Sequence, residues 1–141
     1  MPKKTSKHLF VIRIITGAAF LFFGVFHMLH PENFEALLRI TEIPLVSFNS
    51  NFIRLVDCLI GIFLLIGFQT RLTSAIGCLS SALIIWLSIS IMQMSVADLP
   101  DGLTQKPFHP PVFVLIIVFI FSFYLLLFGG GRWSLDKRGK K

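Results

Sequence analysis

Apolar residues fill four long stretches of this chain, and short polar connections separate them. The stretches cover about residues 9–29, 52–68, 72–94 and 112–128. Each is close to the 17–25 residues with which a helix crosses the hydrocarbon core of a bilayer. Helices satisfy their own backbone hydrogen bonds in lipid, and the short alternating segments of a membrane β-barrel are absent. The pattern therefore predicts an all-α fold, a polytopic single domain built as a bundle of four transmembrane helices.

Composition supports a membrane location. Of the 141 residues 55% are hydrophobic and 14% are charged, and 16 are phenylalanine. A mean hydropathy of +0.81 fits a small integral membrane protein. The net charge is +6, but the lysines lie at the two ends beside apolar segments. That distribution is typical of a membrane flank, so the lipid bilayer is the expected partner and nucleic acid is excluded.

Lysine and arginine are spread unevenly over the connections. The outer two connections hold Arg39 and Lys106, while the inner turn holds Arg71. The other basic flanking residues lie near the termini: Lys3, Lys4, Lys7, Arg132, Lys137, Arg138, Lys140 and Lys141. Cytoplasmic segments carry this excess of positive charge, so both termini are predicted to be cytoplasmic.

The connections carry their own signals. Between the first two stretches, Pro31 suits the first position of a short helix that ends before Pro44. Its apolar face is formed by Phe34, Leu37 and Leu38, with Glu35 and Arg39 spaced as an i, i+4 ion pair. We expect this helix to lie on the outer surface. Residues 68–71 predict a tight helical hairpin, and the three glycines at 129–131 end the last helix.

One face of the first stretch carries polar and small residues. These are Arg13, Gly17, Phe20, Gly24 and His27, spaced i, i+4, i+7, i+11 and i+14. Arginine and histidine are costly in lipid, and glycine lets two backbones approach closely, so this face is predicted to contact other helices. The second stretch has a similar face with Arg54, Asp57 and Gly61.

His27, Asp57 and Arg54 lie at similar depths if the two helices are antiparallel neighbours. A charge inside a membrane normally has a partner, which predicts a buried cluster of these three residues near the outer face. Two interpretations stay open: a latch that fixes helix register, or a site that handles protons or binds a ligand. Arg13 is predicted to bond inward, to Asp136 or to carbonyls near Gln69, rather than to lipid phosphates.

The last two stretches predict packing rather than chemistry. The third has a stripe of mostly small residues that indicates a packing seam: Ser74, Cys78, Ser81, Ile85, Ser88 and Met92. The fourth is almost entirely bulky and faces lipid or a partner protein. Cys58 and Cys78 lie at different depths, which predicts free thiols. The spacing of histidines and cysteines predicts no metal site.

The chain resembles the DoxX-like family of small four-helix bacterial membrane proteins. The resemblance rests on three pieces of sequence: Arg13-x-x-x-Gly17…Gly24, Asp57-x-x-x-Gly61 followed by residues 65–71 ending in Thr70-Arg71, and residues 129–136. The family often has lysine near His27 and glutamate at the position of Asp57, which implies that these two sites are close. It also implies a bacterial inner membrane and a link to membrane oxidoreductase systems, beside a thiosulfate:quinone oxidoreductase or with thiol and oxidative-stress enzymes.

These observations lead to one functional hypothesis and two alternatives. The chain is expected to be an accessory rather than catalytic subunit of a redox system, binding a quinone-like ligand beside His27, Asp57 and Arg54. One alternative is a structural or assembly protein that docks a partner through residues 112–128. The other is a small transporter or channel, which the sparse polar stripes favour least. Whether the chain forms a homo-oligomer stays open.

Overall fold

The computed structural model describes residues 5–99, 106, 110–131 and 133–135, and every regular element among them is a helix. The elements are α1 (Thr5–Leu29), α2 (Pro31–Ile40), α3 (Val46–Ile66), α4 (Thr70–Gln93), the 3₁₀ turn η1 (Val96–Asp98) and α5 (Val112–Phe128). The prediction of an all-helical chain is confirmed. Helix α2 is the short helix that was predicted between the first two apolar stretches.

Three of the helices are long and apolar enough to cross a membrane. They are the segments Lys7–Leu29, Val46–Ile66 and Thr70–Gln93. The fourth predicted span corresponds to α5, which is apolar but has 17 residues. α3 begins six residues before the predicted stretch because its first turns are polar and find partners in the protein. The Asn49 side chain, for example, donates to the Pro44 carbonyl at 2.6 Å.

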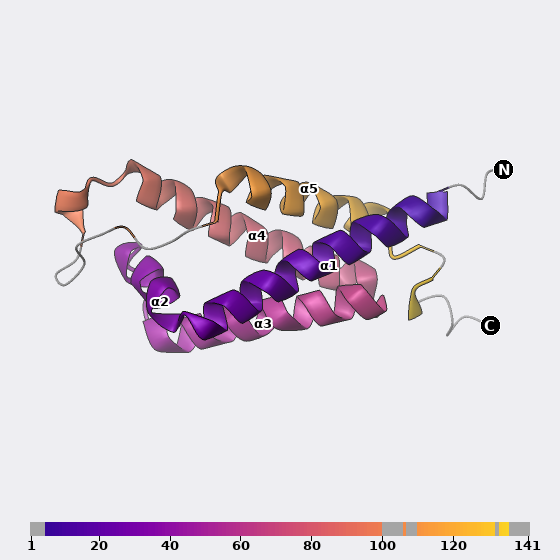
Figure 1. Ribbon diagram of the computed structural model, residues 1–141, viewed down its shortest axis with the longest axis horizontal. Coiled ribbons are helices and arrows are strands. Elements are labelled where there is room, and N and C mark those ends of the chain that lie inside the picture. The colour runs from indigo at the N-terminus through magenta and orange to yellow at the C-terminus, as the bar shows by residue number, and fades with distance from the viewer. Residues whose placement is uncertain (1–4, 100–105, 107–109, 132, 136–141) are drawn as a thin grey trace.

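The helices form two closely packed pairs (Figure 1). α1 packs along α3, and α4 packs along α5, with α3–α4 and α1–α5 contacts joining the pairs. The start of α1, the α3–α4 turn and the end of α5 lie at one end of the bundle, called here the Arg13 end. The connection through α2 lies at the opposite end, called here the Arg54 end.

Glycines set the separation of α1 and α3. A Cβ atom added at Gly61 would lie 2.6 Å from the Leu21 nitrogen, and one at Gly24 would lie 2.6 Å from the Cys58 Sγ atom. A Cβ at Gly17 would lie 3.1 Å from the Gly61 carbonyl oxygen. The three glycines that the sequence placed on packing faces therefore all lie in the α1–α3 interface, where a side chain would force the helices apart.

The short helix α2 packs against protein through its apolar face. It begins with Pro31 and ends before Pro44, as predicted. Its buried residues join a core with Leu87 and Ile91 of α4: Phe34, Leu37, Leu38 and Ile40. The apolar face of α2 therefore covers α3 and α4, and the expectation that the helix lies on the outer surface stays a prediction.

The remaining connections follow the sequence closely. Gly67, with a φ of 72°, ends α3 in the left-handed conformation, and α4 begins at Thr70, so the tight hairpin is confirmed. Gly129, with a φ of 77°, ends α5. The predicted seam of α4 is buried at Ser74, Cys78, Ser81 and Ser88, whereas Met92, in the last turn of the helix, is 59% exposed.

Helix α5 contacts the bundle through one face. The residues buried on it are Leu115, Val118, Ser122 and Leu125. Large apolar side chains on its other face are exposed: Phe113, Ile116, Ile117, Ile120, Phe123 and Leu127. A face of this kind suits lipid or a partner protein, as the sequence predicted.

Candidate functional site

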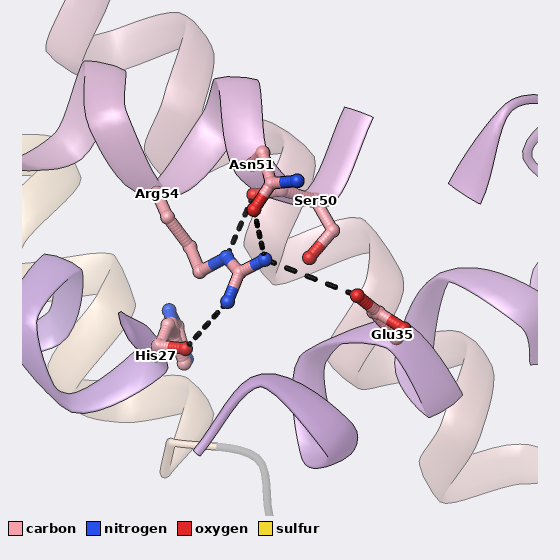
Figure 2. Close-up of polar contacts among 5 residues, drawn as sticks. All are labelled: His27, Glu35, Ser50, Asn51 and Arg54. Carbon is pink, nitrogen blue, oxygen red and sulfur yellow. Dashed lines mark hydrogen bonds and ion pairs between the residues drawn. The ribbon is translucent and has the colours of Figure 1, made fainter. Parts of the chain in front are cut away.

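Arg54 is the centre of a polar network at the Arg54 end (Figure 2). Its side chain is buried between α1, α2 and α3, with the residue 6% exposed. Nε donates to the Ser50 carbonyl at 3.0 Å, Nη1 to the His27 carbonyl at 3.2 Å, and Nη2 to Asn51 Oδ1 at 2.5 Å. The guanidinium thus joins the last turn of α1 to the first turns of α3.

Glu35 of α2 supplies the negative charge beside Arg54. Its Oε1 atom lies 3.9 Å from Arg54 Nη2, which is ion-pair range but longer than a hydrogen bond. The Glu35 side chain is 28% exposed, against 7% for Arg54. The predicted Glu35–Arg39 pair does not form, because Glu35 is on the side of α2 that faces α3, where the buried guanidinium lies.

His27 lies on the last turn of α1 with its ring buried. The ring stacks on Phe34 of α2, with centroids 4.6 Å apart, and meets Phe26 edge-on at 6.0 Å. The residue is 4% exposed, and Nδ1 has no hydrogen-bond partner within the part of the chain that the structure describes. A buried ring nitrogen without a partner loses the hydration that it had in water, so a group that formed a hydrogen bond with it would stabilise the site.

Asp57 is completely buried one helical turn deeper than Arg54. Its Oδ1 accepts a hydrogen bond of 2.5 Å from Ser80 of α4, while Oδ2 has no partner among the described residues. The backbone of Asp57 faces Gly24, since a Cβ at Gly24 would lie 3.3 Å from the Asp57 carbonyl carbon. Asp57 therefore lies where α1, α3 and α4 meet.

The predicted cluster of His27, Asp57 and Arg54 has a different geometry from the one expected. Arg54 does reach His27, but it bonds the main-chain carbonyl and not the ring. No hydrogen bond or ion pair between described residues joins Asp57 to either of the other two. The cause is competition: Ser50, Asn51 and Glu35 surround the guanidinium, and Ser80 binds the carboxylate.

Arg13 makes the inward bond that its place on the glycine face predicted. It is 1% exposed, and it donates from Nη1 to the Gly130 carbonyl at 2.9 Å and from Nη2 to the Trp133 carbonyl at 3.1 Å. These two acceptors lie after α5 rather than near Gln69, and a Cβ added at Gly67 would fall against Arg13 Nη1. The other expected acceptor, Asp136, lies outside the described residues.

Other residues complete the Arg13 end. Trp133 meets Phe10 edge-on with centroids 5.1 Å apart, and Phe10 also lies 5.3 Å from the guanidinium carbon of Arg13. Arg71, which is exposed, reaches the Leu127 carbonyl at 3.4 Å. The chain around Gly67 and Thr70 therefore packs against Gly130 and Ser134, and both segments meet Arg13.

Sequence reasoning missed three partners of the site: Glu35, Asn51 and Ser80. Asn51 is three residues before Arg54, a helical spacing that would have found it. Glu35 and Ser80 come from α2 and α4, and their pairing depends on tertiary packing, which gives no local signal. Both cysteines are free, with Cys58 Sγ 3.9 Å from Met28 Sδ. Within the described ranges, no three His, Cys, Asp or Glu side chains converge on one point.

No family model, no curated protein and no solved structure matches this chain.

Proposed function

We propose that this chain is an accessory subunit of a membrane redox system and binds a small quinone-like ligand beside His27 and Asp57. The observation that carries the proposal is a pair of buried polar atoms without partners on facing helices, His27 Nδ1 and Asp57 Oδ2. Each unfilled position costs about 1–3 kcal/mol, which a ligand that supplies the missing hydrogen bond would recover.

A quinone suits these two atoms and their surroundings. Its carbonyl oxygens accept hydrogen bonds, as from an imidazole N–H, and its reduced form carries hydroxyls that donate to a carboxylate. The Phe26 and Phe34 rings beside His27 supply apolar surface for a planar head group. We assign the electron transfer to the partner oxidoreductase that the DoxX-like resemblance implies, and binding to this chain.

The same proposal places the chain in a bacterial inner membrane with four spans and both termini cytoplasmic. Three spans follow from α1, α3 and α4. The 17 residues of α5 extend about 25 Å, which local bilayer thinning accommodates. The start of α1 and the end of α5 lie at the Arg13 end, beside the exposed basic residues Lys7 and Arg71. This location of positive charge supports a cytoplasmic Arg13 end.

Titration of the purified protein with a short-chain ubiquinone tests the ligand. We expect saturable binding that weakens about tenfold or more in His27→Ala and in Asp57→Asn, since each removes a hydrogen bond to a buried group. The matched controls are His8→Ala and Asp98→Asn, which make the same changes at exposed positions. Absence of saturable binding by the unmodified protein, or equal effects of site and control variants, would contradict the proposal.

An assembly role is a second candidate, and the exposed apolar face of α5 favours it. Crosslinking in native membranes separates the two functions. A stable partner that is lost on substitution of Phe113 and Phe123, with quinone binding absent, would support assembly alone. Both residues are exposed, so replacing them with alanine leaves the bundle core intact.

A further inference from the structure

We propose that Arg54 is a binding site for an oxyanion, and that Glu35 occupies this site as an internal competitor. The inference goes beyond the quinone-like ligand, because it concerns a different group and a different ligand charge. It rests on the geometry of the Arg54–Glu35 pair. Among the residues that the structure describes, this is the only pair of opposite charges within 4.0 Å.

The donor capacity of Arg54 is not filled. A guanidinium has five N–H donors in a planar fork, and the described hydrogen bonds of Arg54 use three of them. All three acceptors, two main-chain carbonyls and the Asn51 amide oxygen, are neutral. Two donors therefore remain on a group that is 6% exposed and whose positive charge no hydrogen-bonded anion balances.

Glu35 balances that charge only loosely. A charge-assisted N–H···O bond measures about 2.7–2.9 Å, whereas the Glu35 Oε1 atom stays 3.9 Å from Arg54 Nη2. With 28% of its side chain exposed, Glu35 also keeps access to solvent, and it approaches from α2, a separate helix (Figure 2). An incoming carboxylate or phosphate oxygen that reached hydrogen-bond distance would bind more tightly than Glu35 does and displace it.

The groups around the Arg54 guanidinium favour an anion as the ligand. Arg54 is the charged group of α3 at this position, Glu35 faces it from α2, and α1 presents the His27 carbonyl and ring. Asp57 is bound to Ser80. Planar, bidentate recognition of carboxylate and phosphate is the chemistry for which arginine is best suited. The oxyanion could be a free anion or the head group of an anionic lipid, and the chemistry is the same.

The test uses the full chain in nanodiscs of phosphatidylcholine, with inorganic phosphate as the probe and thermal stability as the readout. We expect phosphate to raise the unfolding temperature, and we expect Glu35→Gln to tighten phosphate binding about fivefold to tenfold, because the internal competitor loses its charge. The matched control is Glu32→Gln, which makes the same change of charge at an exposed position of α2. Arg54→Lys, which keeps the charge but loses the fork, should weaken binding.

A parallel measurement identifies the source of the anion. Nanodiscs that contain phosphatidylglycerol, without phosphate, should stabilise Glu35→Gln more than Glu32→Gln if a lipid head group is the ligand. A selective response to either probe supports the oxyanion site. Equal responses of the two variants to both probes would overturn it. Because the probes carry no quinone, failure of quinone binding leaves this result unaffected, and the reverse also holds.

Discussion

Two buried arginines, one at each end of the bundle, both link segments through hydrogen bonds to main-chain carbonyls, but their other neighbours differ. Arg13 and Arg54 are 1% and 6% exposed, and each donates to at least one main-chain carbonyl of another segment. Arg13 joins α1 to the chain after α5, and Arg54 joins α3 to the end of α1. The described neighbours of Arg13 include the Gly130 and Trp133 carbonyls, Gly67 and the Phe10 ring. Those at the Arg54 end include the Glu35 carboxylate at 3.9 Å and His27 Nδ1, which has no partner among the described residues.

The difference separates a structural arginine from a candidate functional one. A guanidinium whose neighbours are backbone groups in a tight glycine-lined space fixes the positions of helices and leaves no room for a ligand. One whose neighbours include an exchangeable side chain keeps capacity for another partner. Burial and charge alone do not distinguish the two ends, but the chemical identity of the neighbouring groups and their distance from the guanidinium do.

The largest effect should come from removing Arg13. In Arg13→Ala the Gly130 and Trp133 carbonyls lose their donor, and the link between α1 and the chain after α5 is broken. We expect the free energy of unfolding to fall by about 3–5 kcal/mol. Denaturation in mixed micelles, followed by circular dichroism, measures this value.

Arg71→Ala is the matched control for Arg13→Ala. Arg71 is exposed and makes a bond of 3.4 Å to the Leu127 carbonyl, so its loss should cost less than about 1 kcal/mol. If the two alanine variants unfold at the same denaturant concentration, Arg13 is not the link that the structure indicates, and the contrast between the two ends weakens.

Glycine-to-alanine substitutions should lower the free energy of unfolding by intermediate amounts and compare how tightly the two ends of the bundle are packed. Gly67→Ala places a Cβ against the Arg13 guanidinium and 2.8 Å from the Ser134 Cβ atom, at a φ of 72° that alanine adopts only with strain. We expect a loss of about 2–3 kcal/mol. Gly24→Ala meets the Cys58 Sγ atom at 2.6 Å, which can turn away, and the Cys58 backbone nitrogen at 2.9 Å, which cannot. The higher helix propensity of alanine, about 1 kcal/mol, offsets part of this overpacking.

The expected loss for Gly24→Ala is therefore about 1 kcal/mol, and the same denaturation experiment compares the two variants. Gly17→Ala is the control within the α1–α3 interface, because its nearest neighbours lie at 3.1 Å. These contacts, one of them to the Gly61 carbonyl oxygen, are tight but above the distance at which atoms must move, so its effect should be the smallest of the three. A larger loss for Gly24→Ala than for Gly67→Ala would mean that the Arg54 end is the more rigidly packed one.

The sequence predicted the helices far better than the partners within the bundle. Helix ends at Gly67 and Gly129, the hairpin at Thr70 and the start of α2 at Pro31 depend on local chemistry that a single segment carries. The facing glycines of α1 and α3 were also predictable, because small residues at helical spacing indicate close packing. These features needed no knowledge of which helices are neighbours.

The candidate site was only partly predictable. Depth arguments placed Arg54 beside His27, but they could not show that the guanidinium would bond the carbonyl instead of the ring. Asp57 was assigned to the same cluster because two of the three helices were considered. The third helix, α4, supplies Ser80, and α2 turns inward to supply Glu35. Side-chain pairing across helices depends on rotation and on competition among acceptors, which local sequence does not encode.

The smallest effect concerns Asp98 of η1, at the Arg54 end and outside the spanning helices. Its Oδ2 atom accepts from Ser95 Oγ at 2.7 Å and from the Ser95 backbone nitrogen at 3.3 Å. These hydrogen bonds favour the ionised carboxylate and lower the pKa of Asp98. Their contribution to stability is present above the usual pKa of aspartate and is lost as the pH falls through the lowered value.

In Ser95→Ala the side-chain donor is gone, so the pKa of Asp98 should rise toward its usual value while the fold is unchanged.

Carboxyl chemical shifts measured by NMR over a pH titration report the pKa of Asp98 directly. Ser90→Ala is the matched control, because the Ser90 hydroxyl donates to the Trp86 carbonyl and has no bond to Asp98. The pKa of Asp98 should be the same in this control as in the unmodified protein. An unchanged pKa in Ser95→Ala would show that the capping contact does not persist in solution, so the polar contacts at this end would be looser than those around Arg13. That result would extend the contrast between the two ends from the helices to the connection after α4.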